Sequence, residues 1–213
     1  MLIKFWNWFT KLTAWPIQWL LFRTKIYYED PSKQKRHIKG PAVIISNHTS
    51  VFDYVVWLFV FYTRTVRFQM AELLFKKKVL GVLLRMLGGI YVDRDAKNFG
   101  FVTESLDILE NGGVVGIFPE SRIPLKHEKT PLEFKTSAAY IALTSGVPVI
   151  PVYTNGSYFN RKRAAAIIGK PLFASELTKQ GLTDKENINE VSVQLRNRII
   201  ELEKLFNEKH KAS

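Results

Sequence analysis

Short apolar segments rich in β-branched residues alternate with longer helix-like segments along most of this chain. The apolar segments cover residues 42–46 (AVIIS), 90–92 (IYV), 114–118 (VVGIF) and 147–153 (VPVIPVY). Each is typical of a strand that is buried on both faces of a sheet. Helix-like segments cover residues 53–62, 71–87, 98–110 and 134–145. This alternation predicts an α/β fold in which a mostly parallel sheet is flanked by helices on both faces.

The length of 213 residues and an apolar content of 46% suit one large domain with a substantial core. We expect this domain to span residues 40–213. Near its end, residues 189–209 carry apolar side chains at close to helical spacing, with charged residues between them. This pattern predicts a surface helix docked on the sheet.

Residues 1–22 predict a different kind of segment. Polar side chains at Lys4, Asn7, Lys11 and Gln18 recur at helical spacing and form a narrow stripe beside a broad apolar face. Four of the five tryptophans lie in this segment, and tryptophan suits the headgroup boundary of a membrane. We therefore expect an amphipathic helix at the membrane interface, with its lysines reaching lipid phosphates. The alternatives are a helix packed on the core and, less suited to the interrupted pattern, a spanning helix.

Residues 23–40 are polar and basic and end in a turn at Gly40-Pro41. We expect a loop here, so that residues 1–39 form a membrane-interface helical segment and a basic linker. Thirty-one Lys and Arg against nineteen Asp and Glu give a formal charge of +12, which favours an anionic partner. That partner could be a phosphate compound, a nucleic acid or an acidic membrane surface. The absence of cysteine excludes a disulfide framework and a cysteine nucleophile.

His48 and Asp53 are the strongest candidates for chemistry. His48 follows the strand expected at 42–46, and Asp53 comes five residues later. Open α/β sheets bind their ligands at this edge of the strands. A histidine there can take a proton from a hydroxyl, while a carboxylate on its other ring nitrogen fixes the tautomer. By itself the spacing also suits a helix-capping Asp53 and a hydrogen-bonded histidine.

Four sequence blocks in a fixed order make a catalytic role for His48 and Asp53 more specific than the spacing of these two residues alone. They are SNHTSVFD at 46–53, GIYVDR at 89–94, FPESR at 118–122 and VPVIPV at 147–152. They resemble the signature blocks of the glycerolipid acyltransferase family, which includes the 1-acylglycerol-3-phosphate acyltransferases. The resemblance covers most of residues 40–153. It implies transfer of a fatty acyl group from acyl-CoA or acyl-carrier protein to the free hydroxyl of 1-acylglycerol 3-phosphate (lysophosphatidate), giving phosphatidate in phospholipid synthesis.

The resemblance also implies roles for particular residues. His48 and Asp53 are the expected catalytic pair, and the expected substrate-binding residues are Asn47, Arg94, Glu120, Ser121, Arg122 and Lys135. Arginine suits phosphate, because its planar fork matches phosphate oxygens. Glu120 carries the wrong charge for phosphate, so we expect it to contact glycerol hydroxyls or to orient an arginine. No metal or other cofactor is expected beyond the thioester co-substrate.

The third block departs from the family pattern. The family has Gly-Thr between the Glu and the Arg, whereas this chain has only Ser121. The loop is one residue shorter and lacks the glycine, so Arg122 is expected to sit differently. Acyltransfer to another acceptor, such as glycerol 3-phosphate, another lysophospholipid or a lyso-aminolipid, therefore stays open.

Two functions from other classes are the remaining alternatives. The basic clusters at 76–78 and 161–163 could bind nucleic acid. Aromatic side chains do not interleave with these clusters as a stacking platform requires, so we expect no nucleic-acid partner. The second alternative is a membrane-binding module that has the same fold but no catalytic activity, and only an activity assay would distinguish it from an enzyme. We expect an enzyme at the cytoplasmic face of the cell membrane, held peripherally or monotopically.

Overall fold

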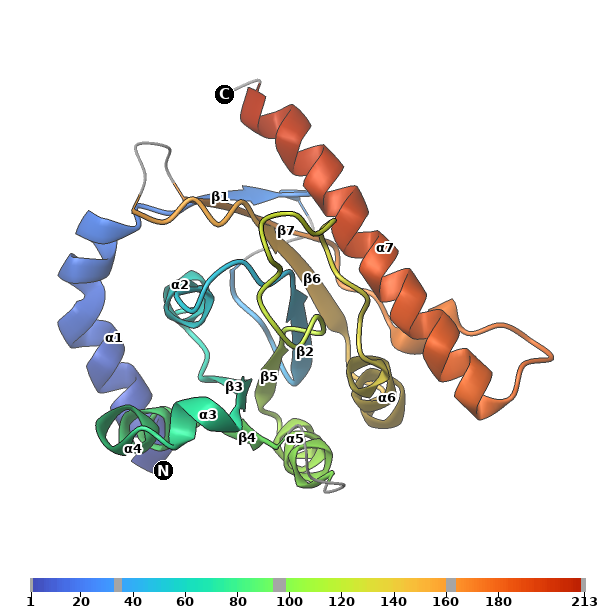
Figure 1. Ribbon diagram of the computed structural model, residues 1–213, viewed down its shortest axis with the longest axis horizontal. Coiled ribbons are helices and arrows are strands. Elements are labelled where there is room, and N and C mark those ends of the chain that lie inside the picture. Colours follow the sequence, from blue (N-terminus) through green and yellow to red (C-terminus); the bar gives the residue numbers. More distant parts are fainter. Residues whose placement is uncertain (1, 33–35, 94–98, 160–163, 212–213) are drawn as a thin grey trace.

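The structure, a computed structural model, describes residues 2–32, 36–93, 99–159 and 164–211. Within these residues one sheet has the strand order β1-β7-β6-β2-β5-β3-β4 (Figure 1). Its strands are β1 (Lys25–Tyr28), β2 (Ala42–Ser46), β3 (Val66–Ala71), β4 (Ile90–Val92), β5 (Val114–Ile117), β6 (Val149–Thr154) and β7 (Ala165–Ile168). Neighbouring strands are parallel except β6 and β7, which are antiparallel. The predicted α/β fold with a mostly parallel sheet is confirmed.

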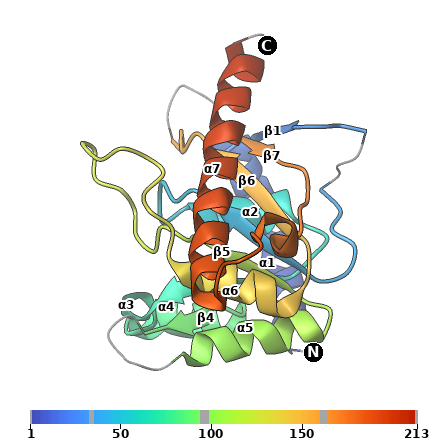
Figure 2. The ribbon, with the colours of Figure 1, turned by 90° about the vertical axis from the view of Figure 1, so that its right-hand side faces the viewer.

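Helices cover both faces of the sheet, as predicted (Figure 1). The helices are α1 (Leu2–Leu21), α2 (Asp53–Val60), α3 (Glu72–Phe75), α4 (Lys78–Met86), α5 (Gly100–Glu110), α6 (Thr136–Ser145) and α7 (Asp184–Lys211), with a 3-10 turn at Ala174–Leu177. The strand β2 shows how the two layers share the sheet. Val43 and Ile45 face the core beneath α5, α6 and α7, while Ala42 and Ile44 face the core beneath α2. In Figure 2 the long helix α7 crosses in front of the sheet.

Two predictions about the elements are wrong. Residues 25–28 were expected in a loop, but they form β1, which pairs with β7. The sheet thus includes residues on both sides of the boundary expected at residue 40. The helix expected at 71–87 is two helices, α3 and α4, preceded by the strand β3. Gly81 is buried where they meet, and a Cβ there would lie 2.2 Å from the carbonyl oxygen of Phe75.

The helix α1 presents Asn7 and Lys11 of its polar stripe to the protein and most of its apolar side chains to the outside, while Lys4 is exposed. Asn7 is buried and donates to the carbonyl of Leu87 over 3.3 Å. Lys11 is also buried and donates to the carbonyls of Tyr62 and Arg64 over 3.1 and 2.6 Å. Lys11 is therefore not positioned to reach lipid phosphates, which corrects that expectation.

The outward face of α1 is mostly apolar, with the exposed Thr13 among its apolar side chains. Its exposed side chains are Leu2, Phe5, Trp8, Phe9, Leu12, Trp15, Ile17, Trp19, Leu20 and Leu21. A helix packed on the core through its apolar face would bury these side chains, so that alternative is excluded. None of the described helices is long and apolar enough to span a membrane.

Candidate active site

His48 and Asp53 meet at the edge of the sheet, as their spacing predicts. His48 lies in the loop after β2, and Asp53 is the first residue of α2. The Nδ1 atom of His48 lies 2.8 Å from Oδ2 of Asp53. Both residues are buried, with Asp53 at 0% exposure. A neutral imidazole held in this way donates from Nδ1, and its other nitrogen, Nε2, is left as the acceptor.

Asp53 is held in place by donors on both of its oxygens. The backbone N–H groups of Thr49 and Ser50 donate to Oδ2 over 2.7 and 3.0 Å. The Thr49 hydroxyl donates to Oδ1 over 2.9 Å. Such a set of donors fixes the plane of the carboxylate oxygens.

Tyr158 supplies a further donor that the sequence analysis missed. Its hydroxyl donates to Oδ1 of Asp53 over 2.7 Å. Burial, followed by the negative charge of Asp53, raises the pKa of Tyr158 well above its usual value, so this hydroxyl stays protonated and remains a donor. Tyr158 follows β6 in a segment without a recognisable motif, and its separation of 105 residues from Asp53 gives no signal in the sequence.

The imidazole of His48 stacks on the ring of Phe118, with the centroids 4.4 Å apart. The Nε2 atom makes no hydrogen bond within the described residues. The histidine lines a cavity of about 530 Å³, so this acceptor nitrogen is available to a ligand.

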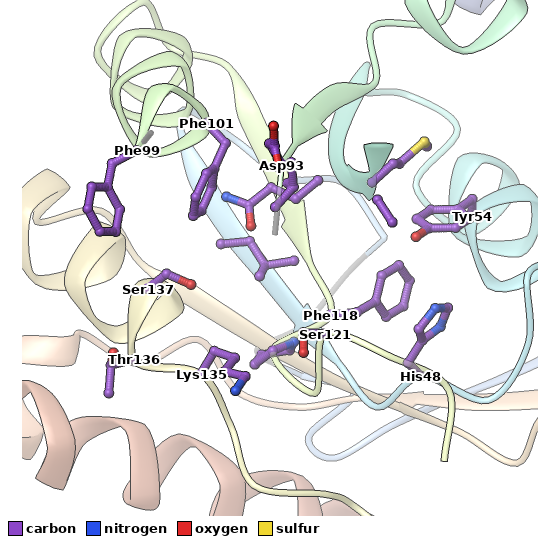
Figure 3. A pocket seen from close by; sticks show the side chains of 16 residues that line it. His48, Tyr54, Asp93, Phe99, Phe101, Phe118, Ser121, Lys135, Thr136 and Ser137 are labelled. Atoms are coloured by element: carbon purple, nitrogen blue, oxygen red, sulfur yellow. The ribbon is translucent and has the colours of Figure 1, made fainter. Parts of the chain in front are cut away.

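The cavity has a polar end and an apolar end (Figure 3). The polar end is formed by Ser121 and by Lys135, Thr136 and Ser137 at the beginning of α6. The backbone N–H groups at the beginning of a helix attract anions, and Lys135 adds a full positive charge. The rest of the lining is mostly apolar and comes from Tyr54, Met70, Val92, Phe99, Phe101, Ile117 and Phe118, with Gln69 and the carboxylate of Asp93 among them. A molecule with an anionic head and an apolar body matches this division.

A second cavity, of about 330 Å³, also reaches His48. Its lining includes Thr49, Glu120 and Asn155, together with residues 123–126, 128, 130 and 131. Two cavities that meet at one imidazole are compatible with a reaction between two substrates.

Glu120 does not have the surroundings that were expected. Its two oxygens accept hydrogen bonds from the backbone N–H groups of His48 and Leu132, over 2.8 and 2.7 Å. Burial raises the pKa of this carboxyl, and the two backbone bonds oppose that shift. Glu120 therefore joins the histidine loop to the segment before α6, and it also lines the second cavity beside His48.

Arg122 also departs from its expected role. Its guanidinium forms two hydrogen bonds with Glu128, at 2.6 and 2.5 Å, on the surface. This partner lowers the pKa of Glu128 to about 2. Arg122 does not line the cavity of about 530 Å³, whereas its neighbour Ser121 does. Ser121 has a φ of 59°, a left-handed conformation that favours the glycine of the family pattern.

Asn47 ties two strands together and also lines the second cavity. Its side-chain amide donates to the carbonyl of Thr154 and accepts from the N–H of Thr154, both over 2.9 Å. These bonds join the end of β2 to the end of β6. Arg94, the remaining expected phosphate ligand, lies outside the described residues. Lys135 is the expected cation that the structure places at the cavity with His48.

Comparison with known proteins decides the family. The sequence model described as Acyltransferase matches residues 23–155, which is more than half of the chain. This chain belongs to the acyltransferase family. The matched residues of this acyltransferase include His48, Asp53 and Glu120, and Tyr158 lies just beyond them.

Named relatives of this acyltransferase include two 1-acyl-sn-glycerol-3-phosphate acyltransferases. The protein from Haemophilus influenzae is 27% identical over 174 residues, covering 77% of this chain and 70% of the relative. The human protein of that name, the beta form, is 29% identical over 159 residues, covering 69% of this chain and 55% of the relative. The 1-acyl-sn-glycerophosphate acyltransferase of Thermotoga maritima shares the fold, with a TM-score of 0.64, 21% identity and coverage of 95% of this chain and 79% of the other.

Proposed function

We propose that this acyltransferase moves a fatty acyl group from acyl-CoA or acyl-carrier protein to the free hydroxyl of 1-acylglycerol 3-phosphate. One observation carries the proposal. The Nδ1 atom of His48 is bonded to Asp53, while the ring lines a cavity with a cationic end and an apolar end. The names of the relatives support the same acceptor.

The reaction needs no nucleophile from the protein. Nε2 of His48 takes the proton of the acceptor hydroxyl as its oxygen attacks the thioester carbonyl. The C–O bond forms, the C–S bond breaks, and the imidazolium returns the proton to the departing thiolate. Asp53 stabilises the imidazolium between these steps, because its carboxyl group is bonded to Nδ1.

The polar end of the larger cavity would hold the acceptor's phosphate. Lys135 provides a charge, the beginning of α6 provides oriented N–H groups, and Ser121 and Ser137 provide hydroxyls. The acyl chains would occupy the apolar lining around Phe99, Phe101 and Met70, where apolar contacts replace contacts with water. In this arrangement Lys135 takes the role that the family resemblance suggested for Arg122.

One observation favours a second group of acceptors. Arg122 is paired with Glu128 at the surface, and the third block is one residue shorter than in the family. Among the described residues, a site with fewer cations at the phosphate has less to distinguish lysophosphatidate from other lysophospholipids or a lyso-aminolipid, and glycerol 3-phosphate carries the same phosphate as lysophosphatidate. These acceptors therefore belong in the first activity test.

We further propose that α1 lies in the cytoplasmic face of the cell membrane. Its apolar, tryptophan-rich face is exposed, and Asn7 and Lys11 of its polar stripe are bonded to the protein. Such a helix sits with its apolar side among the headgroups and the first part of the acyl chains. The site would then take a lipid acceptor from the surface to which the enzyme is bound.

The proposal can be tested with purified protein, both thioester donors and a panel of acceptors, with the products identified by mass spectrometry. The panel includes lysophosphatidate, glycerol 3-phosphate and lysophosphatidylethanolamine. We expect phosphatidate to form fastest, and His48→Ala protein to form almost none. Faster acylation of another acceptor would contradict the acceptor assignment, and no acylation of any acceptor by folded protein would contradict the enzymatic proposal.

A further inference from the structure

The short helices α3 and α4 carry a second exposed apolar surface. Leu73 is 64% exposed, and Val79 is 84% exposed. Val79, Val82 and Leu83 lie three and four residues apart on α4 and share one helix face, on which all three are exposed. Core packing does not explain apolar side chains gathered in this way on an outer face.

The position of this surface is fixed by close packing beneath it. Gly81 lies on the buried side of α4 against the carbonyl of Phe75, so the two helices approach more closely than a larger residue would allow. Phe75 is buried, and its ring contacts Tyr91 of β4 with the centroids 5.5 Å apart. The exposed face is therefore held by α3 and β4 and is a fixed part of the fold.

Positive charge borders the same surface. Lys76, Lys77 and Lys78 are consecutive and exposed between α3 and α4, and Arg85 is exposed further along α4. Lys76 pairs with Glu72 over 2.7 Å. An apolar face bordered by lysines matches a surface with apolar chains below and anionic groups above, which is the arrangement of an acidic bilayer.

The exposed apolar surface of α3 and α4 adjoins the exposed apolar surface of α1. The two helices are in contact, since Asn7 of α1 donates to the carbonyl of Leu87 directly after α4. Figure 1 shows α4 beside the N-terminal end of α1, where Leu2, Phe5 and Trp8 are exposed.

We propose that α3 and α4 form a second membrane-contacting element, whose apolar face enters an anionic bilayer beside α1. This inference rests on the proposed membrane attachment through α1 and adds a second contact to it. Contacts through both α1 and the α3–α4 element fix the tilt of the enzyme relative to the membrane. A single helix lying in the interface leaves that tilt undetermined. They also place the bilayer near the cavity, because the cavity residues Met70 and Ala71 immediately precede α3.

The absence of cysteine allows a single labelled position in an otherwise unchanged chain. An environment-sensitive fluorophore is attached to Val79→Cys, to Leu12→Cys on α1 and to Val193→Cys. Val193 is a matched control, because it is an exposed valine on α7, across the molecule from α1 (Figure 1). Vesicles contain phosphatidylcholine with phosphatidylglycerol, with or without brominated acyl chains.

We expect vesicles to shift the emission of the probes at 79 and 12 to shorter wavelength and brominated chains to quench both, while the probe at 193 stays unchanged. A change at 12 without a change at 79 would overturn the α3–α4 inference and leave the attachment of α1 intact. No change at either position would overturn both. A shift at 79 without vesicles that grows with protein concentration would assign the face to a second copy and overturn the inference.

Charge substitutions provide an independent measurement. The double variant Val79→Glu, Val82→Glu is expected to bind the vesicles at least tenfold more weakly than Val193→Glu, with all proteins folded by circular dichroism. Changing Lys76, Lys77 and Lys78 to Gln should weaken binding about fivefold per lysine on anionic vesicles and leave phosphatidylcholine vesicles unaffected. Equal binding by all variants would overturn the inference.

Discussion

The hydroxyl of Tyr158 donates to Oδ1 of Asp53 over 2.7 Å, while Oδ2 of the same carboxylate contacts Nδ1 of His48 over 2.8 Å. A residue of the loop after β6 thus lies directly behind the pair contributed by β2 and α2. The ring of Tyr158 also contacts Phe22, just after α1, with the centroids 5.7 Å apart. The end of the proposed membrane helix therefore packs against a residue that holds the Asp53 carboxylate.

Tyr158→Phe should change the pH dependence of the reaction. With one donor fewer, the Asp53 carboxylate holds the imidazolium more strongly, so the acid limb of the kcat/KM profile should move to higher pH. The lost bond to a charged group should also lower the free energy of unfolding by about 1.5–3 kcal/mol. Profiles of the wild type, Tyr158→Phe and the exposed control Tyr140→Phe provide the measurement. An unmoved acid limb in Tyr158→Phe would show that the tyrosine has only a packing role.

Lys135 and Arg122 should affect acceptor binding unequally. Lys135 lines the cavity with His48, whereas Arg122 is held by Glu128 at the surface. Lys135→Ala should therefore raise the KM for the acceptor about tenfold or more, as expected for a lost charge-assisted contact, with little change in the KM for the donor. Arg122→Ala serves as the matched variant and should change the acceptor KM less. A larger effect of Arg122→Ala than of Lys135→Ala on the acceptor KM would contradict this prediction and assign phosphate binding to Arg122, as the family resemblance implies.

Much of the fold can be predicted from the sequence, because the short apolar runs at 42–46, 90–92, 114–118 and 147–153 form strands of the sheet. The strands β2 and β4 have the predicted bounds, and α7 contains the predicted C-terminal helix. The strand β1 was missed because its residues, KIYY, are mixed in polarity and only partly buried at the edge of the sheet. The break between α3 and α4 was missed because it depends on the contact of Gly81 with Phe75.

The candidate site is less visible in the sequence than the fold. The pairing of His48 with Asp53 follows from their spacing, because a loop and the first turn of a helix bring them together. The roles of Glu120 and Asn47 depend on which backbone groups lie nearby, and those groups belong to other elements. The pairing of Arg122 with Glu128 removes a cation that the motif alone places at the phosphate.

Lys11 should make the stability of the protein depend on pH above neutrality. Burial lowers the pKa of Lys11 to about 8, below its value in the unfolded chain. As the pH rises from about 8 towards about 10.4, the unfolded chain holds a proton that the folded protein has released, so stability rises with pH. Lys11→Met should lack this rise, while the exposed control Lys4→Met should keep it. Urea unfolding between pH 7 and 10 measures the difference, and parallel curves for wild type and Lys11→Met would contradict the prediction.

The most direct test of the account is the single-turnover rate of acyl transfer from a thioester to lysophosphatidate by wild-type and His48→Ala protein on the same vesicles. Circular dichroism and vesicle binding show that the variant is folded and attached. Removal of a general base lowers such a rate by roughly 10²–10⁴, and we expect a loss in this range. A folded, membrane-bound His48→Ala protein that transfers the acyl group at nearly the wild-type rate would contradict the account.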